Sequence, residues 1–114
     1  MSFDDEKLKK ICSGNDKLYR SLNTLGLFLK PENIEQKEKE IIEKITHIEK
    51  KPETIDNLES LYRILMRYYL YTGSKDSLVK YAQKEKKLLK SEEYSSIIKN
   101  PSIAIGKVKE YYKV

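Results

Sequence analysis

The chain contains little of the chemistry on which most enzymes depend. Its 114 residues include one cysteine, one histidine and no tryptophan. The single cysteine, Cys12, excludes an internal disulfide, and we expect it to pack as a small apolar residue. His47 follows Glu43 by one helical turn, but a metal site would need at least one further imidazole or thiolate ligand. We therefore expect no catalytic set, no metal and no cofactor, and we predict that the chain is not an enzyme.

Glycine, proline and long apolar runs are also scarce. The four glycines and three prolines are scattered, so the sequence has no glycine-rich loop to hold a phosphate. No apolar run is long enough to cross a bilayer, and the opening "MSFDDEKLKK" has no apolar signal region. We therefore expect no membrane association and a cytoplasmic location.

The chain is rich in charged residues and in regularly spaced apolar residues. Charged residues make up 36% of it and hydrophobic residues 39%, a composition typical of a helical protein with a packed core. The length suits a single domain, residues 1–114. The helical pattern is interrupted at residues 13–15, 31, 50–52, 72–74 and 99–102.

The apolar spacing between these interruptions predicts helices throughout. They are expected over residues 3–12, from a cap at 15 or 16 to 31, over 31–50, 55–72, 75–90 and 92–99, and after 101. Ser74 and Ser91 are the expected caps of the fifth and sixth helices. "SIAIGKV" alternates briefly, but a strand without a partner is unstable. We predict an all-α fold, a compact bundle of about five to seven helices.

The helix expected over residues 55–72 is apolar over an unusually wide arc. One stripe contains Ile55, Leu58, Tyr62, Leu65 and Tyr69, and an adjacent stripe contains Leu61, Ile64, Tyr68 and Tyr71. So wide an arc is typical of a central helix with neighbours on several sides. We expect Tyr62 and Tyr69 to be buried because they share a stripe with leucines.

A weak internal similarity leaves a second arrangement open. "KLYRSLNTLGLF" at 17–28 aligns with "SLYRILMRYYLY" at 60–71, an offset of 43 residues. This offset is close to the period of two-helix repeats, and each segment is followed by a break and another long helix. The alternative to a simple bundle is therefore two stacked helical hairpins.

The two halves of the chain differ in charge. Residues 1–57 contain eleven basic and twelve acidic side chains, a net charge of −1. Residues 58–114 contain twelve basic and six acidic side chains, a net charge of +6. The excess positive charge of the protein therefore belongs to its second half, where it can attract a polyanion.

Helical phase divides these cations into rows. Arg63 and Arg67 are four residues apart, and Lys80, Lys84 and Lys87 follow one line along the fifth helix. Lys86 and Lys90 form a second row, with only Glu85 among the lysines to relieve their repulsion. Such a row can neutralise phosphates, and exposed tyrosines can stack on bases. The predicted nucleic-acid site is Arg63, Arg67, Tyr71, Lys75, Lys80, Tyr81, Lys84 and Lys87.

Both features also have an ordinary structural explanation. Lysines on a polar helix face are the usual solvated surface, and tyrosines at helical spacing often belong to the core. We expect exposure of Tyr68, Tyr71 and Tyr81 in particular. The turn in "YLYTGSKDSLVKY" is the nearest candidate for a helix-turn-helix motif, and it is a weak one.

These patterns favour a nucleic-acid-binding helical module that contacts the phosphate backbone of DNA or RNA. Such a module would act as an accessory factor in DNA or RNA processing or replication. The alternative is a small protein-interaction subunit, an adaptor or a homo-oligomer, which would use the wide apolar arc of the central helix. A third hypothesis is an accessory domain for an enzyme on another chain. The sequence leaves the choice between DNA and RNA, and between one strand and two, open.

Overall fold

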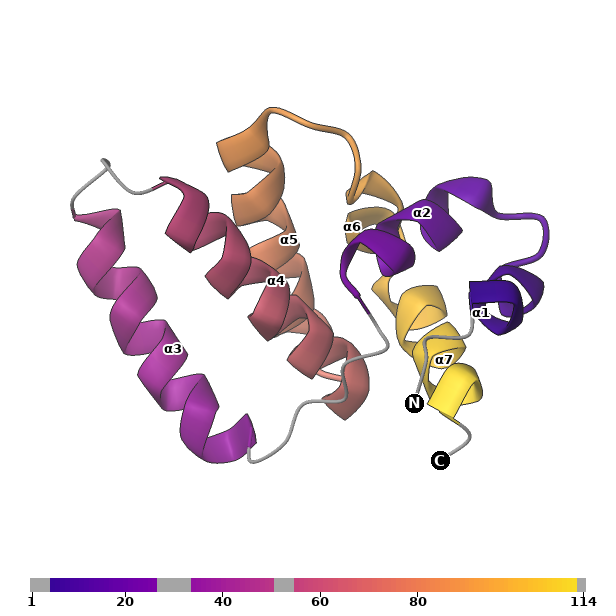
Figure 1. Ribbon diagram of the computed structural model, residues 1–114, viewed down its shortest axis with the longest axis horizontal. Coiled ribbons are helices and arrows are strands. Elements are labelled where there is room, and N and C mark those ends of the chain that lie inside the picture. Colours follow the sequence, from indigo (N-terminus) through magenta and orange to yellow (C-terminus); the bar gives the residue numbers. More distant parts are fainter. Residues whose placement is uncertain (1–4, 27–33, 51–54, 113–114) are drawn as a thin grey trace.

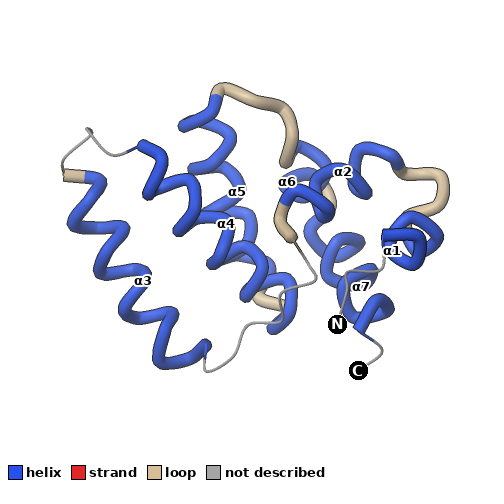
Figure 2. The backbone as a smooth tube through the Cα atoms, viewed as in Figure 1, coloured by secondary structure: helices blue, strands red, loops and turns tan. Residues whose placement is uncertain are grey.

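Helices account for nearly all of the described structure. The computed structural model describes residues 5–26, 34–50 and 55–112, and within these it has seven helices and no strand (Figures 1 and 2). The helices are α1 (Asp5–Ile11), α2 (Asp16–Thr24), α3 (Ile34–Glu49), α4 (Ile55–Thr72), α5 (Lys75–Leu89), α6 (Ser95–Lys99) and α7 (Pro101–Tyr112). The predicted all-α fold is confirmed.

Helix α4 lies at the centre of the arrangement. It packs against α3 on one side, against α5 along most of its length, and against α7 near its end. Helices α3, α4 and α5 form one group in Figure 1, and α1, α2, α6 and α7 form the other. The helices enclose a compact body with extents of 41 × 30 × 26 Å.

Of the two arrangements left open by the sequence, the structure shows the compact bundle. Stacked hairpins would pair α2 with α3, but α3 packs against α4, and α2 packs against α1 and α6. Figure 1 shows α2 and α3 on opposite sides of α4. The similarity between residues 17–28 and 60–71 therefore reflects the spacing that two amphipathic helices share.

The core follows the apolar stripes of the sequence. On α4 the stripe of Leu58, Tyr62, Leu65 and Tyr69 is buried, as predicted, and Met66 and Leu70 are completely buried beside it. The second stripe, Leu61, Ile64, Tyr68 and Tyr71, is half-buried. Burial on both flanks gives α4 its central position, because a helix that is apolar over a wide arc is stabilised by neighbours on several sides.

Local chemistry explains most of the helix ends. The Asn15 side chain caps α2 by accepting a hydrogen bond from the Leu18 amide, 3.1 Å away. Gly73, at φ +80°, ends α4 and lets its own amide and that of Ser74 donate to the Tyr69 carbonyl. The Ser74 hydroxyl bonds to that of Thr72 and makes no cap of its own.

The sixth helix begins later than predicted. Its first residue is Ser95, because the Ser91 hydroxyl accepts a hydrogen bond from the Glu93 amide and closes a turn before the helix. The predicted boundary at Pro31 lies outside the described residues.

Candidate nucleic-acid interface

Helix α5 has one buried face and one face crowded with lysines. Its buried residues are Leu78, Tyr81, Ala82 and Glu85. The other side contains five lysines, which we call the α5 lysine face: Lys80, Lys84, Lys86, Lys87 and Lys90. Three of these, Lys80, Lys87 and Lys90, are exposed, and the other two are half-buried. The phase predicted for Lys80, Lys84 and Lys87 is therefore confirmed.

Glu85 does not lie among these lysines, and the prediction that it relieves their repulsion is wrong. It follows Tyr81 by four residues, so helical phase places it on the inner face, where it is 0% exposed. No other acidic residue occurs between residues 77 and 91. Because its one carboxylate is turned inward, the outer face of this segment bears positive charge alone.

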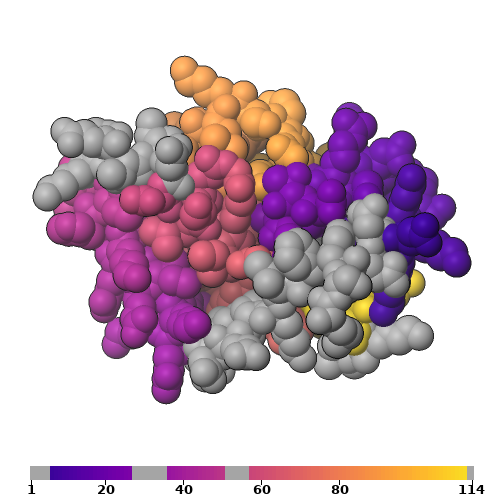
Figure 3. Space-filling view, viewed as in Figure 1, coloured from indigo at the N-terminus to yellow at the C-terminus, as the bar shows by residue number. Residues whose placement is uncertain are grey.

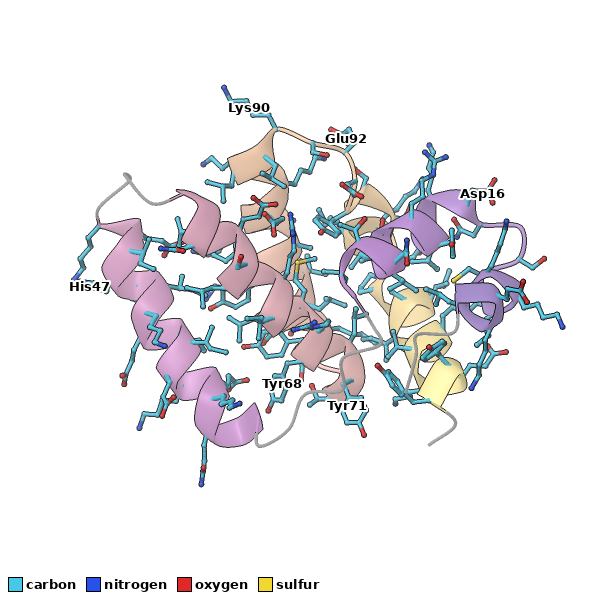
Figure 4. The ribbon with its side chains drawn as sticks, in the orientation of Figure 1. Asp16, His47, Tyr68, Tyr71, Lys90 and Glu92 are labelled. Carbon is cyan, nitrogen blue, oxygen red and sulfur yellow. The ribbon has the colours of Figure 1, made fainter. Side chains whose placement is uncertain are left out.

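Neighbouring helices and loops supply two carboxylates to the face. Glu49, at the end of α3, pairs with Lys84 at 2.8 Å, and Glu92 pairs with Lys86 at 3.2 Å. Lys80 lies over the ring of Tyr81, 5.5 Å from its centroid. Within the described residues Lys87 and Lys90 form no ion pair. Lys90 extends outward at the end of α5 in Figure 4.

The two arginines of the predicted site face the interior of the protein. Arg63 pairs with Glu59, and its Nε lies 3.8 Å from Oε2 of Glu85. Arg67 donates from Nη1 to the Gly26 carbonyl at 3.4 Å, and burial lowers the pKa of its guanidinium. They do share a face of α4, as predicted, but that face packs inside the protein. Their expected role as exposed phosphate contacts is therefore not supported.

The tyrosines also belong mainly to the core. Tyr81 is only 5% exposed and stacks on Tyr69, with ring centroids 5.8 Å apart, so the prediction that it is exposed is wrong. Tyr71 is half-buried against the edge of Tyr112. Figure 4 shows Tyr68 and Tyr71 at the end of α4 that is remote from Lys90. The α5 lysine face thus gains no stacking partner from them.

Lys75, the first residue of α5, is exposed at that remote end, where the half-buried Tyr71 also lies. The predicted site therefore divides into three parts. Lys80, Lys84 and Lys87 come together on the outer face of α5, and Lys75 lies away from them at the start of the helix. Arg63 and Arg67 are half-buried and bonded to other groups of the protein, and Tyr81 is buried.

Two adjoining grooves lie at the end of α5. The first has a volume of about 510 Å³ and is lined by Gln83, Lys86, Lys87, Lys90, Ser91, Glu92 and Ile98. The second, of about 590 Å³, is lined by Lys17, Arg20, Ser91, Glu92, Glu93 and Ser95. Ser91 and Glu92 line both grooves.

Sequence reasoning missed Lys17 and Arg20 as candidate site residues. They lie in the half of the chain whose net charge is −1, and no local pattern connects α2 with α5. Their position depends on α2 packing against α6 and α6 packing against α5. Nothing in the sequence could have indicated this proximity, because it arises from contacts between distant segments.

A buried polar cluster lies beneath the α5 lysine face. Burial raises the pKa of the Glu85 carboxyl to about 7, the Arg63 cation works in the opposite direction, and Glu93 adds to the increase. Among the described residues neither carboxylate oxygen of Glu85 meets a hydrogen-bond partner, and the buried hydroxyl of Tyr94 lies close to Arg63 and Glu85. Because Glu85 is 0% exposed, we relate this cluster to stability and not to ligand binding.

None of the His, Cys, Asp and Glu side chains of the described residues gather in groups of three or more that could hold a metal ion. Cys12 is buried, and desolvation raises the pKa of its thiol. His47 is exposed near the end of α3, as Figure 4 shows. Among the helices described, none has both the length and the apolar composition that a membrane span requires.

Comparisons with other proteins add no constraint on function. The chain matches no protein-family model, and no curated protein or solved structure is significantly similar to it.

Proposed function

We propose that the protein is a nucleic-acid-binding module that contacts the phosphate backbone of DNA or RNA through the α5 lysine face. It would act as an accessory factor in DNA or RNA processing or replication. We propose a cytoplasmic location, where such a nucleic acid would be its partner. One observation carries the proposal. Glu85 is turned inward, so that the outer surface of α5 from Lys80 to Lys90 has lysines and no acid.

The physical basis is the release of counterions. Each lysine that neutralises a phosphate frees a condensed cation, so affinity depends steeply on salt concentration. The α5 lysine face contains no exposed aromatic side chain to stack on a base. We therefore expect binding that tolerates different sequences, with strength set by charge and little contribution from stacking.

The ion pairs of Lys84 and Lys86 reduce the positive charge that the α5 lysine face offers to a phosphate, but they do not remove it. Both lie at the surface, where a pair contributes little to stability and a phosphate can compete for the lysine. Lys80, Lys87 and Lys90 remain the most accessible cations. They are also the best positions for a test, since replacing Lys84 would disturb its contact with Glu49.

The test compares two variants that lose the same charge. In the first, Lys80, Lys87 and Lys90 are replaced by glutamine, and in the control Lys37, Lys39 and Lys44 of α3 are replaced by glutamine. All six lysines are exposed, and each variant changes the net charge from +5 to +2. Binding to short labelled single- and double-stranded DNA and RNA is measured by fluorescence anisotropy between about 50 and 200 mM salt.

We expect the α5 variant to lose most of its affinity and to show a salt dependence shallower by about three in slope, one for each lysine. The α3 control should retain most of the affinity of the unaltered protein. Absence of binding by the unaltered protein at low salt overturns the proposal, as does an equal loss in both variants. Stronger binding to vesicles of anionic lipid than to any nucleic acid also overturns it.

The protein-interaction alternative has no comparable support. Among the described residues, Ile103, 47% exposed, is the single large hydrophobic side chain on the surface. The wide apolar arc of α4 is covered by α3, α5 and α7. Light scattering on the purified protein would show an oligomer if this alternative holds.

A further inference from the structure

The two grooves at the end of α5 share part of their lining. Ser91 and Glu92 line both of them, and the segment that contains these residues joins α5 to α6. Helix α6 packs against both α5 and α2, whose surfaces adjoin in the view of Figure 3. A polymer that occupies the first groove can therefore reach the second by passing Ser91 and Glu92.

The second groove has cations of its own. Lys17 and Arg20 are one helical turn apart on α2, both are exposed, and neither forms an ion pair within the described part of the chain. Glu93 also lines this groove, and its Oε1 accepts a hydrogen bond from the Thr24 hydroxyl at 2.6 Å. An arginine fork is well suited to grip a phosphate through two parallel hydrogen bonds.

Glu92 is the main obstacle on this path. Its carboxylate accepts hydrogen bonds from the Ser95 hydroxyl at 2.5 Å and from Lys86, and its side chain is 80% exposed. These two contacts lower the pKa of Glu92, so it remains ionised at neutral pH. In the unbound protein it therefore occupies Lys86 in the manner of an anionic ligand.

We propose that a bound nucleic-acid strand continues from the α5 lysine face past Ser91 and Glu92 into the second groove, where Lys17 and Arg20 hold its phosphates. In passing Glu92 the backbone displaces this residue from Lys86. This inference rests on the proposed function and extends it, because it adds cations from the acidic half of the chain to the same site. The five lysines of the α5 lysine face together with Lys17 and Arg20 outnumber the carboxylates of Glu92 and Glu93 along this path, and this excess of positive charge favours a polyanion as the occupant.

The first experiment removes the two α2 cations. Lys17 and Arg20 are replaced together by glutamine, and a control replaces Lys37 and Lys39 on α3; each variant changes the net charge from +5 to +3. The substitutions spare the backbone carbonyls of Lys17 and Arg20 that accept from Ser21 and Thr24, so helix α2 should remain intact. Circular dichroism and thermal unfolding verify this.

We expect the α2 variant to bind short DNA and RNA more weakly than the control, with a salt dependence shallower by about two in slope. Glu92→Gln should bind several-fold more tightly than the unaltered protein, since Lys86 is released. Glu110→Gln is its matched control, because Glu110 also pairs with a lysine, Lys107, but on α7. It should leave affinity nearly unchanged.

The possible failures are distinguishable. If the unaltered protein binds no nucleic acid, the proposed function and this inference both fail. If replacement of Lys80, Lys87 and Lys90 weakens binding but replacement of Lys17 and Arg20 has no more effect than the α3 control, this inference alone is overturned. An unchanged affinity in Glu92→Gln overturns the displacement of Glu92.

Discussion

Replacement of Glu85 by glutamine should stabilise the protein at neutral and alkaline pH and remove most of the pH dependence of its stability. Glu85 is completely buried on α5, and within residues 5–26, 34–50 and 55–112 neither of its oxygens has a hydrogen-bond partner. In the same part of the chain its ion-pair partner is Arg63, which lies 3.8 Å away and is shared with Glu59. A buried charge with so little compensation lowers the free energy of unfolding.

The direction of the effect follows from the two protonation equilibria. The carboxyl has a pKa near its ordinary 4.5 in the unfolded chain and about 7 in the folded protein, because burial penalises the charged form. Below about pH 4.5 the carboxyl is protonated in both states and does not change the free energy of unfolding. As the pH rises toward 7, the unfolded state releases its proton first, so folding becomes less favourable. Above about pH 7 both states are ionised and the full penalty remains.

The difference between these two pKa values sets the magnitude. It corresponds to a full penalty of about 3 kcal/mol at high pH. Between about pH 5 and pH 8 the free energy of unfolding should fall by about 2 to 3 kcal/mol. For a chain of this length that change lowers the melting temperature by about 10 °C.

Urea unfolding followed by circular dichroism, repeated across this pH range, measures the effect. The matched control is Glu43→Gln, which removes an exposed carboxylate from α3 and should keep the slope of the unaltered protein. A free energy of unfolding that is flat between about pH 5 and pH 8 in the unaltered protein would refute the reasoning. The same conclusion holds if Glu85→Gln retains the full slope.

Two further substitutions test the packing of α4. Tyr62→Phe removes the hydroxyl that donates a hydrogen bond to Glu49 at 2.6 Å. It should therefore lower the free energy of unfolding, measured by urea titration, by about 1 kcal/mol. An unchanged free energy of unfolding would show that water replaces this hydrogen bond without loss of stability. Gly73→Ala puts a side chain on a residue at φ +80°, a backbone conformation that disfavours a Cβ atom. It should lower the free energy of unfolding by about 1 to 2 kcal/mol, and the melting temperature should fall accordingly. An unchanged melting temperature would contradict this prediction.

Helical phase predicted the core of the second half of the chain well. The stripe of Leu58, Tyr62, Leu65 and Tyr69 is buried because residues at spacings of three and four share a face of a helix. The same rule also places Glu85 on the inner face with Tyr81. The predictions for Glu85 and Tyr81 were wrong because the carboxylate was assigned by its neighbours along the chain and the tyrosine by its chemistry, without regard to helical phase.

The position of the arginines required knowledge of the fold. Arg63 and Arg67 share a face of α4, as their spacing predicts, but spacing does not say whether that face meets solvent or another helix. In this protein it is covered, since Arg67 reaches the Gly26 carbonyl and Arg63 reaches Glu85. A central helix has few exposed positions, so a cation on it is more often engaged internally than a cation on a peripheral helix. The wide apolar arc of residues 55–72 already indicated this centrality.

The burial of Glu85 connects the stability of the protein with its proposed binding surface. A residue at this position of α5 points inward, so an acid there reduces stability but cannot neutralise the lysines outside. Glu85→Gln should therefore change the free energy of unfolding and leave the salt dependence of nucleic-acid binding nearly unaltered. Replacement of Lys87 and Lys90 should make the salt dependence of binding shallower and leave the free energy of unfolding nearly unaltered. The reason is that both side chains are exposed and form no ion pair among the described residues. If the two effects do not separate in this way, the inner and outer faces of α5 are not the independent surfaces that its helical phase implies.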